Sequence, residues 1–337
     1  MRTRTLAGLV TALMLALFSA TGCAEVLRND EARNIVPVPY DVRELIRPKK
    51  KFFGMAVNDV REPKVIEKFA KDAGRRPNLV AFYVSFLDKL DVEYVTKIWE
   101  GGAVPLVVWE PMRMSAADVA AGKYDGVLRD WAETIRALPM PIVINWGHEF
   151  NGDWYPWGLC VKRRPQSVAC KTGYKTTAAD WLNSYKRVHD QFMFYGATNS
   201  IWLWSPNIND GRGVDLEDYW PGQKYVDWVG PIGYFEWSGP GSAMRFGDLF
   251  DPTIRQIRKF SNKPVLIPET GAPPGPNKAA EIGDLWHSVA TRKDVVGAIW
   301  FHIKKEKDWR FTTDPGAHAA FKDAARNPML RLDPAAP

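Results

Sequence analysis

Residues 141–158, PIVINWGHEFNGDWYPWG, decide the fold, because a buried strand passes without a spacer into acidic and aromatic residues. The run 141–146 is apolar apart from one asparagine, as expected for a parallel strand covered on both faces. The carboxyl ends of such strands meet at one edge of a sheet or barrel, where side chains that carry chemistry gather. This stretch therefore predicts a parallel α/β fold with a site at that edge.

Similar apolar runs recur along the chain and alternate with amphipathic segments. Strands are predicted at 52–57, 79–84, 104–109, 141–146, 200–204, 226–234, 264–267 and 295–301. Helices are predicted at 65–73, 92–101, 116–138, 179–195, 216–219, 243–260, 278–291 and 317–326, with Asp91 and Asp180 as helix starts. Eight strands, each followed by a helix, predict a single (β/α)₈ TIM barrel in the α/β class. The alternative is a doubly wound open sheet, but no glycine-rich phosphate turn follows the first strand to favour a nucleotide site.

The N-terminal segment has the order of an export signal. Arg2 and Arg4 precede an apolar run at 6–18, and small residues lead to Gly22-Cys23, which resembles a bacterial lipoprotein processing site. We expect residues 1–22 to be a signal peptide, 23–50 a spacer and domain entry, and 51–330 the barrel. The prediction is an exported protein in the cell envelope, with a membrane anchor through lipid on Cys23. The alternative is ordinary secretion.

Composition and cysteine count narrow the function classes. The 337 residues are 46% hydrophobic and 25% charged, which excludes a disordered or fibrous protein. Lysine and arginine are scattered without a basic block, so a nucleic-acid partner is not favoured. In an oxidising compartment Cys160 and Cys170 would pair, which leaves Cys23 free for lipid. No His/Cys cluster has metal-ligand spacing, and no cofactor is predicted.

Carboxylates and tryptophans follow the predicted strands. Glu110, Glu149, Glu236 and Glu269 all lie at carboxyl ends of strands, and the chain has 15 tryptophans. Two opposed carboxyl groups are the layout for cleavage of a bond between sugars. One is held protonated by burial to act as an acid, and the other is ionised to attack carbon or activate water. Tryptophan faces stack on sugar rings, so this edge predicts a polysaccharide substrate.

The segment after residue 146 resembles the acid/base motif of glycoside hydrolase family 26, whose pattern is close to His-Glu-x-Asn-Gly-x-Trp-x-x-Trp-Gly. The fixed positions are met by His148, Glu149, Asn151, Gly152, Trp154, Trp157 and Gly158. The resemblance spans roughly residues 104–302 and includes 196–199, 204–207, 219–222 and 227–230.

This resemblance implies a barrel enzyme with a retaining mechanism. Glu149 would be the general acid and then the base, and Glu269 the nucleophile, with Glu236 as the rival nucleophile. His148 would hold the nucleophile or a nearby sugar, and Tyr234 would orient Glu269. Trp154 and Trp300 would be stacking platforms for sugar rings. The other substrate-binding residues expected at the rim are Trp109, Glu110 and Asn207. Trp109 has barrel-top core as its alternative.

The sequence predicts the substrate less directly than it predicts the reaction. The family resemblance favours an endo-β-glycanase acting on β-1,4-mannan. Trp109-Glu110-Pro111 stands where mannan-cleaving members tend to have Trp-His, which keeps β-1,3-1,4-glucan and β-1,3-xylan open. A function of another class, a non-catalytic glycan-binding lipoprotein, is the remaining alternative.

Overall fold

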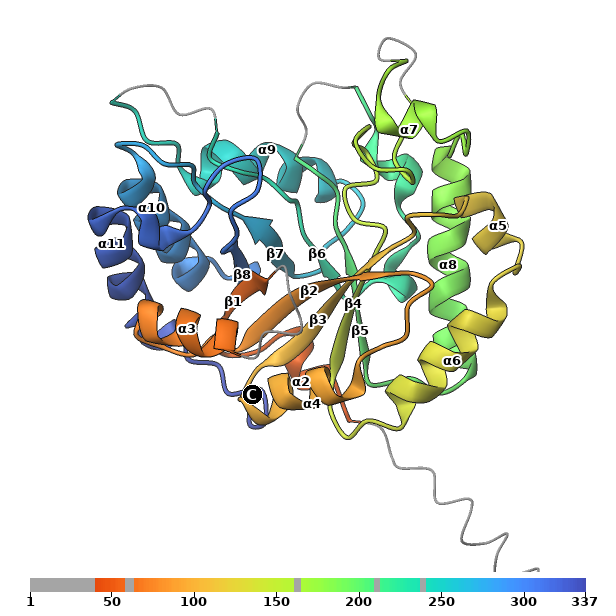
Figure 1. The fold of residues 1–337 in the computed structure, drawn as a ribbon, viewed down its shortest axis with the longest axis horizontal. Coiled ribbons are helices and arrows are strands. Elements are labelled where there is room, and N and C mark those ends of the chain that lie inside the picture. The colour runs from red at the N-terminus through yellow and green to blue at the C-terminus, as the bar shows by residue number, and fades with distance from the viewer. Residues whose placement is uncertain (1–39, 58–63, 161–164, 209–212, 237–240) are drawn as a thin grey trace, which may run out of the picture. The chain divides into compact units, whose positions relative to one another are not determined.

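Eight parallel strands close into a barrel. The computed structural model describes residues 40–57, 64–160, 165–208, 213–236 and 241–337. The strands are β1 (Phe52–Val57), β2 (Leu79–Ser85), β3 (Val104–Glu110), β4 (Ile142–Trp146), β5 (Ser200–Trp204), β6 (Trp228–Val229), β7 (Val265–Thr270) and β8 (Val295–Phe301). Neighbours in sequence pair in parallel, and β8 pairs with β1 (Figure 1). The (β/α)₈ barrel expected from the sequence is confirmed.

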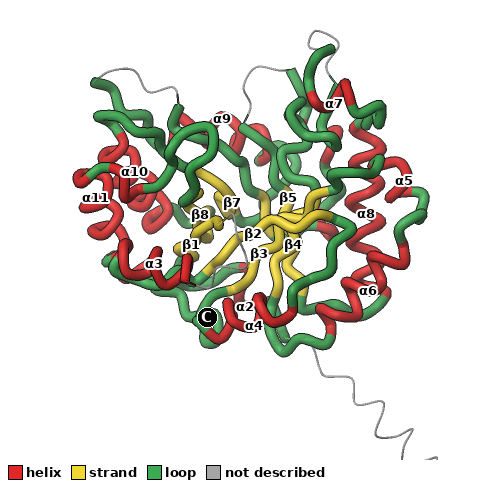
Figure 2. Tube along the Cα trace, in the orientation of Figure 1, coloured by secondary structure: helices red, strands yellow, loops and turns green. Residues whose placement is uncertain are grey.

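Helices surround the strands, as the tube view shows (Figure 2). They are α2 (Arg43–Ile46), α3 (Lys64–Ala73), α4 (Val92–Glu100), α5 (Ala116–Ala120), α6 (Asp125–Arg136), α7 (Val168–Lys171), α8 (Ala178–Phe194), α9 (Phe246–Ile257), α10 (Lys278–Thr291) and α11 (Pro315–Ala325). Short 3₁₀ turns are η1 (Leu216–Tyr219), η2 (Gln223–Tyr225), η3 (Phe311–Thr313) and η4 (Pro328–Leu330). None of the described helices is both long and apolar enough to cross a bilayer. The predicted signal segment 1–22 and Cys23 lie outside the described residues.

Buried side chains form two clusters that alternate along the strands. On β3, Leu106 and Val108 belong to the cluster inside the barrel, whereas Val107 and Trp109 belong to the cluster shared with the helices. This alternation follows from the pleat, because successive side chains of a strand point to opposite faces. A residue's parity on its strand therefore decides whether it can reach the barrel mouth.

Helix α2 closes the end of the barrel opposite the mouth. Leu45 is fully buried in the inner cluster, and the Trp228 indole donates a hydrogen bond to the Ile46 carbonyl at 2.9 Å. Part of the predicted spacer is thus packed against the barrel.

Three predicted elements differ clearly from the structure. The helix expected over 116–138 is interrupted between α5 and α6, where Gly122 has φ +81°, a conformation that favours glycine. The strand expected over 226–234 is only two residues long, and the chain beyond it keeps a single bridge between Asn207 and Ile232. Helix α8 begins earlier than expected because Thr177, rather than Asp180, is its N-cap, in a reciprocal capping box with Asp180.

Candidate active site

A cleft of about 470 Å³ opens at the carboxyl ends of the strands. Its lining residues are Glu149, Trp154, Tyr155, Asn207, Ile208, Gly233, Tyr234, Glu236, Glu269, Phe301, Lys305, Glu306 and Trp309. The two glutamates singled out from the sequence therefore face one cavity.

Glu149 lies in a tight turn directly after β4. Its φ is +51°, in a region that non-glycine residues seldom adopt, and its amide donates to the Ser205 carbonyl at 2.8 Å. The turn is closed by Gly158, where an added Cβ would lie 2.2 Å from the Gly152 carbonyl oxygen. Such strained backbone persists only where the surroundings hold it, and here it directs the Glu149 side chain into the cleft.

The Glu149 carboxyl group is buried and accepts two N–H donors. Asn207 donates from Nδ2 to Oε1 at 2.5 Å, and Trp154 donates from Nε1 to Oε2 at 3.0 Å. Asn207 is fixed in turn by paired hydrogen bonds with Asn151, at 2.7 and 3.0 Å. Burial and the charge of Glu269 raise the pKa of Glu149 well above its ordinary value, and the two N–H donors offset only part of this.

Glu269 lies near the end of β7 and accepts two O–H donors. Tyr83, on β2, donates to Oε2, and Tyr234, which follows β6, donates to Oε1. Burial raises the pKa of Glu269, and these two hydrogen bonds lower it in part. Burial also raises the pKa of both tyrosines well above 10, so both remain protonated donors.

The described hydrogen bond of the His148 side chain is to a tyrosine of the cleft. Its Nε2 lies 3.1 Å from the Tyr155 hydroxyl, and the side chain is absent from the cleft lining. Burial, with a smaller contribution from the Lys305 charge, lowers the pKa of His148 to about 3, so the ring is neutral. In the described part of the chain His148 pairs with Tyr155, which lines the cleft, and not with Glu269, so the expected contact with Glu269 is wrong. Binding of sugar by His148 stays a prediction.

Glu110 adds a further carboxyl group at the barrel mouth. It is the last residue of β3 and is paired in register with Ser85 of β2. Burial and the charge of Glu269 raise the pKa of Glu110 to about 7. Glu110 is half-buried and is not among the residues that line the cleft.

Two predicted sugar-binding tryptophans face the helices instead of the cleft. Trp109 is fully buried with its ring centroid 4.2 Å from that of Trp131 on α6. Trp300 is fully buried against Phe321 of α11, at 5.5 Å. Both assignments are corrected by strand parity, because Glu110 and Phe301, one residue further on, are the side chains on the inner face.

Four aromatic residues of the site were missed from the sequence: Tyr83, Tyr155, Phe301 and Trp309. Tyr83 has the same parity as Leu79 and Ala81, which face the barrel interior, so the pleat could have identified it. Trp309 lies in the segment after β8, where no strand-end rule applies. Its ring lies 4.5 Å from that of Tyr234, and its carbonyl accepts the Trp300 indole N–H at 3.1 Å.

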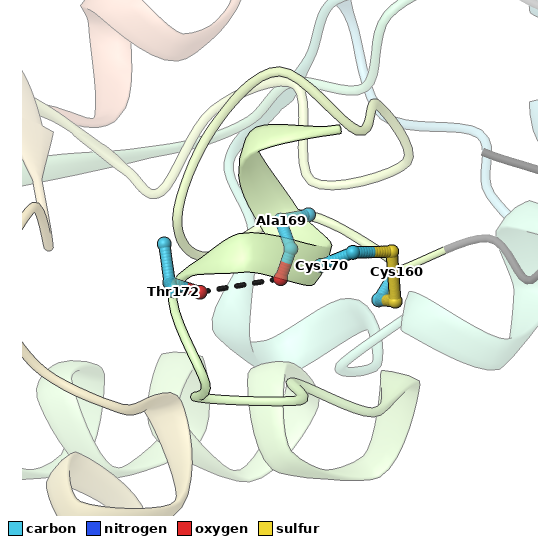
Figure 3. Close-up of a disulfide and its surroundings, with 4 residues drawn as sticks. All are labelled: Cys160, Ala169, Cys170 and Thr172. Atoms are coloured by element: carbon cyan, nitrogen blue, oxygen red, sulfur yellow. Dashed lines mark hydrogen bonds between the residues drawn. A yellow bond between two sulfur atoms is a disulfide. The ribbon is translucent and has the colours of Figure 1, made fainter. Parts of the chain in front are cut away.

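The predicted disulfide between Cys160 and Cys170 is confirmed, with the two Cα atoms 4.6 Å apart (Figure 3). The adjacent Ala169 amide donates to the Asp153 carbonyl at 3.1 Å, which ties this loop to the turn that carries Trp154. The Thr172 hydroxyl donates to the Ala169 carbonyl at 3.2 Å, as the figure also shows. The disulfide is thus part of the support of the Glu149 turn.

No group of three or more His, Cys, Asp or Glu residues suited to a metal ion occurs in the described part of the chain.

Comparison with known proteins agrees with this geometry. The model of "Glycosyl hydrolase family 26" matches residues 115–324. The chain belongs to glycosyl hydrolase family 26. This family 26 chain is 29% identical over 268 residues to Endoglucanase H of Acetivibrio thermocellus, covering 77% of this chain and 28% of that protein. It is 26% identical over 219 residues to a mannan endo-1,4-beta-mannosidase of Bacillus subtilis, covering 63% and 52%.

The family 26 chain therefore spans about a quarter and about half of these two relatives. Among solved structures, a GH26 beta-mannanase from Bacteroides ovatus superposes with a TM-score of 0.60 at 16% identity, covering 86% of this chain and 92% of that one. At this identity the likeness concerns the fold, which is the same closed barrel.

Proposed function

We propose that this protein is a retaining endo-β-glycanase in which Glu149 and Glu269 perform a two-step displacement. The observation that carries the proposal is the placement of both carboxyl groups in one cleft, with the charge of one raising the pKa of the other. Such a pair holds one proton between them at neutral pH, which supplies an acid and a nucleophile together.

In the first step, Glu149 donates its proton to the glycosidic oxygen while a Glu269 oxygen attacks the anomeric carbon. The bond to the leaving sugar breaks, and a glycosyl ester forms on Glu269. In the second step, the Glu149 carboxylate takes a proton from water, whose oxygen attacks the same carbon and releases Glu269. Tyr83 and Tyr234 keep Glu269 oriented and favour its ionised form, and Trp154 contributes an aromatic wall beside Glu149.

We favour β-1,4-mannan as the substrate. Support comes from the family and from the mannan endo-1,4-beta-mannosidase relative. Mixed-linkage β-glucan is the second candidate, because Glu110 replaces the histidine typical of mannan-cleaving members, and the relative that covers most of this chain is named an endoglucanase. β-1,3-Xylan is the third substrate to be included in a screen.

The decisive experiment combines product stereochemistry with two variants. Proton NMR of freshly released sugars from mannan, mixed-linkage glucan and β-1,3-xylan should show the β-anomer first, as retention requires. Glu149→Ala and Glu269→Ala should lose this release while still binding the polysaccharide. Equal release by the wild type and both variants would overturn the proposal, and binding without any hydrolysis by the wild type would favour a glycan-binding protein.

We further propose that the chain is exported and carries lipid on Cys23. The support is the N-terminal sequence together with the Cys160–Cys170 disulfide, since such bonds persist mainly in oxidising compartments. Cells fed labelled palmitate should incorporate label into the wild type and not into Cys23→Ser. A wild-type protein without label in the culture medium would instead indicate ordinary secretion.

A further inference from the structure

Charged side chains are distributed unevenly between the two ends of the barrel. At the mouth, the cleft is lined by Glu149, Glu236, Glu269 and Glu306 and by one cation, Lys305. The opposite end is formed by α2 and by the segments that precede each strand. Lysines and arginines that are scattered in the sequence meet there, because the amino ends of parallel strands lie together.

Three segments show how this end is assembled. Lys49 and Lys50 lie between α2 and β1, Lys259 lies between α9 and β7, and Lys293 lies between α10 and β8. Arg47, which follows α2, donates a hydrogen bond to the Asn262 carbonyl at 3.2 Å and so joins α2 to the segment before β7.

Six cations of this end, Arg47, Lys49, Lys50, Lys259, Lys293 and Arg331, are exposed, and we call this set the basic base. Within the described ranges, none of the six forms an ion pair with an acidic side chain. The exposed acids nearby are few: Asp41 is paired with Arg43, and Glu44, Glu100 and Asp333 remain.

Like charges face one another across this end. Burial, together with the charge of Arg331, lowers the pKa of Arg75 to about 10. Burial also lowers the pKa of Arg258, with the charges of Arg292 and Arg47 adding to the effect against the opposing charge of Asp294. A surface that tolerates this repulsion gains free energy from an anionic partner.

We propose that the basic base binds the anionic surface of a phospholipid membrane. Charge complementarity is the first argument, since several lysines and arginines on one face bind anionic lipid headgroups additively. The second argument is the place at which the described barrel begins. Tyr40, the first described residue, donates to the Pro334 carbonyl at 2.9 Å, and Figure 1 shows α2 and the C-terminus at the same end. The described barrel therefore begins at the end that carries the basic base.

This orientation has a consequence for substrate access. With the basic base against a membrane, the cleft with Glu149 and Glu269 opens on the side away from the lipid. The proposed binding does not depend on catalysis, so each can fail without the other.

The test is co-sedimentation of residues 39–337, which form a compact unit with its own core, with lipid vesicles. Vesicles of phosphatidylcholine alone are compared with vesicles that contain about 30% phosphatidylglycerol, at ~50 mM and ~500 mM salt. The base variant combines Arg47→Gln, Lys49→Gln, Lys50→Gln and Lys259→Gln.

The matched control variant combines Lys89→Gln, Arg113→Gln, Lys171→Gln and Lys175→Gln, which remove the same charge from exposed positions on segments that follow strands. We expect anionic vesicles to bind at least about tenfold more tightly than neutral ones at low salt, with loss at high salt. The base variant should lose at least about tenfold in binding, and the control variant less than about threefold.

Two outcomes would overturn the proposal. One is equal binding to neutral and anionic vesicles, or equal loss by the two variants, which would show no role for this face. The other is tight binding of a single-stranded RNA by the basic base without vesicle binding, which would assign the face to nucleic acid. Hydrolysis of a soluble oligosaccharide at the wild-type rate by the base variant shows that the variant is folded.

Discussion

Glu149 and Glu269 line one cleft, yet their surroundings differ in the donors they supply. Each oxygen of Glu149 accepts an N–H, from Asn207 and Trp154, and each oxygen of Glu269 accepts an O–H, from Tyr83 and Tyr234. Both groups are affected by burial, which raises their pKa values. Each glutamate therefore has two hydrogen-bond donors, so the number of donors does not distinguish the acid/base from the nucleophile.

The difference lies in the kind of donor. The two carboxylates repel each other, so each charge raises the pKa of the other. At Glu269 the hydroxyls of Tyr83 and Tyr234 are the largest influences after burial and lower its pKa. The proposed mechanism assigns the shared proton to Glu149. Variants that alter one set of donors at a time can test this division of roles.

The largest effect is expected from removal of the carboxyl groups themselves. Glu269→Ala should lower kcat/KM on the order of 10⁴-fold or more for every substrate, because no other group can form the ester. Glu149→Ala should cost as much on polysaccharide but far less on a dinitrophenyl glycoside, whose leaving group needs no proton. Steady-state rates on the two substrate types provide the measurement.

Glu236→Gln is the control for this pair, because Glu236 lines the same cleft but is exposed and lies 3.5 Å from Lys307. It should change kcat/KM by less than about tenfold. The roles would have to be exchanged if Glu149→Ala, and not Glu269→Ala, lost activity on both substrate types.

The tyrosine clamp on Glu269 should give the next largest effect. Tyr83→Phe removes one hydrogen bond to a charged group, which predicts a loss of about 10- to 100-fold in kcat/KM. That hydrogen bond lowers the pKa of Glu269, so its removal raises this pKa and moves the acidic limb of the pH profile to higher pH.

Tyr185→Phe is the matched control, since it removes a buried tyrosine hydroxyl that contacts only the Leu203 carbonyl, at 3.4 Å. Its pH profile should be that of the wild type. An unmoved acidic limb in Tyr83→Phe would show that Tyr83 has a structural role alone.

The contrast between Tyr83 and Trp109 shows what the sequence could and could not provide. The barrel and the positions of both glutamates follow from apolar runs and their carboxyl ends, because parallel strands bring those ends together. The alternation of side chains along a strand can also be read from the sequence. Applied to β3 and β8, it would have selected the inward-facing neighbours Glu110 and Phe301 in place of Trp109 and Trp300. Trp309 could not be found, because its position depends on the path of a segment after β8 that no local pattern specifies.

His148 illustrates a different limit. Adjacency to Glu149 in the sequence suggested a shared role, but the left-handed turn at Glu149 separates the two side chains, so that His148 points to Tyr155. A positive φ at a non-glycine residue is decided by the tertiary structure around it and not by the local sequence.

The N–H donors of Glu149 should give a smaller effect on rate and a shift at the other end of the pH profile. Trp154→Phe keeps an aromatic ring but removes the N–H that lowers the pKa of Glu149. The pKa of Glu149 then rises, the acid stays protonated to higher pH, and the alkaline limb moves upward, with a loss of about tenfold in kcat. A downward shift of that limb would contradict the assignment of Glu149 as the acid.

The smallest effect on activity is expected at Glu110. Because burial and the charge of Glu269 raise the pKa of Glu110 to about 7, Glu110 is neutral while Glu269 titrates, and Glu110→Gln should leave the acidic limb of the pH profile in place. The clearer readout is stability. Because the folded-state pKa of Glu110 is raised to about 7, the wild type loses stability as the pH rises from the unfolded value through 7, and the glutamine variant does not.

Denaturant titrations at pH 5 and pH 8 measure this difference. The variant should gain about 1–2 kcal/mol relative to the wild type between the two pH values. An equal difference at both pH values would mean that Glu110 does not share the electrostatic field of the catalytic pair. In that case, Glu110 would act on the substrate alone. Glu110→His should then change the ratio of kcat/KM on mannan to kcat/KM on mixed-linkage glucan, without any shift in the pH profile.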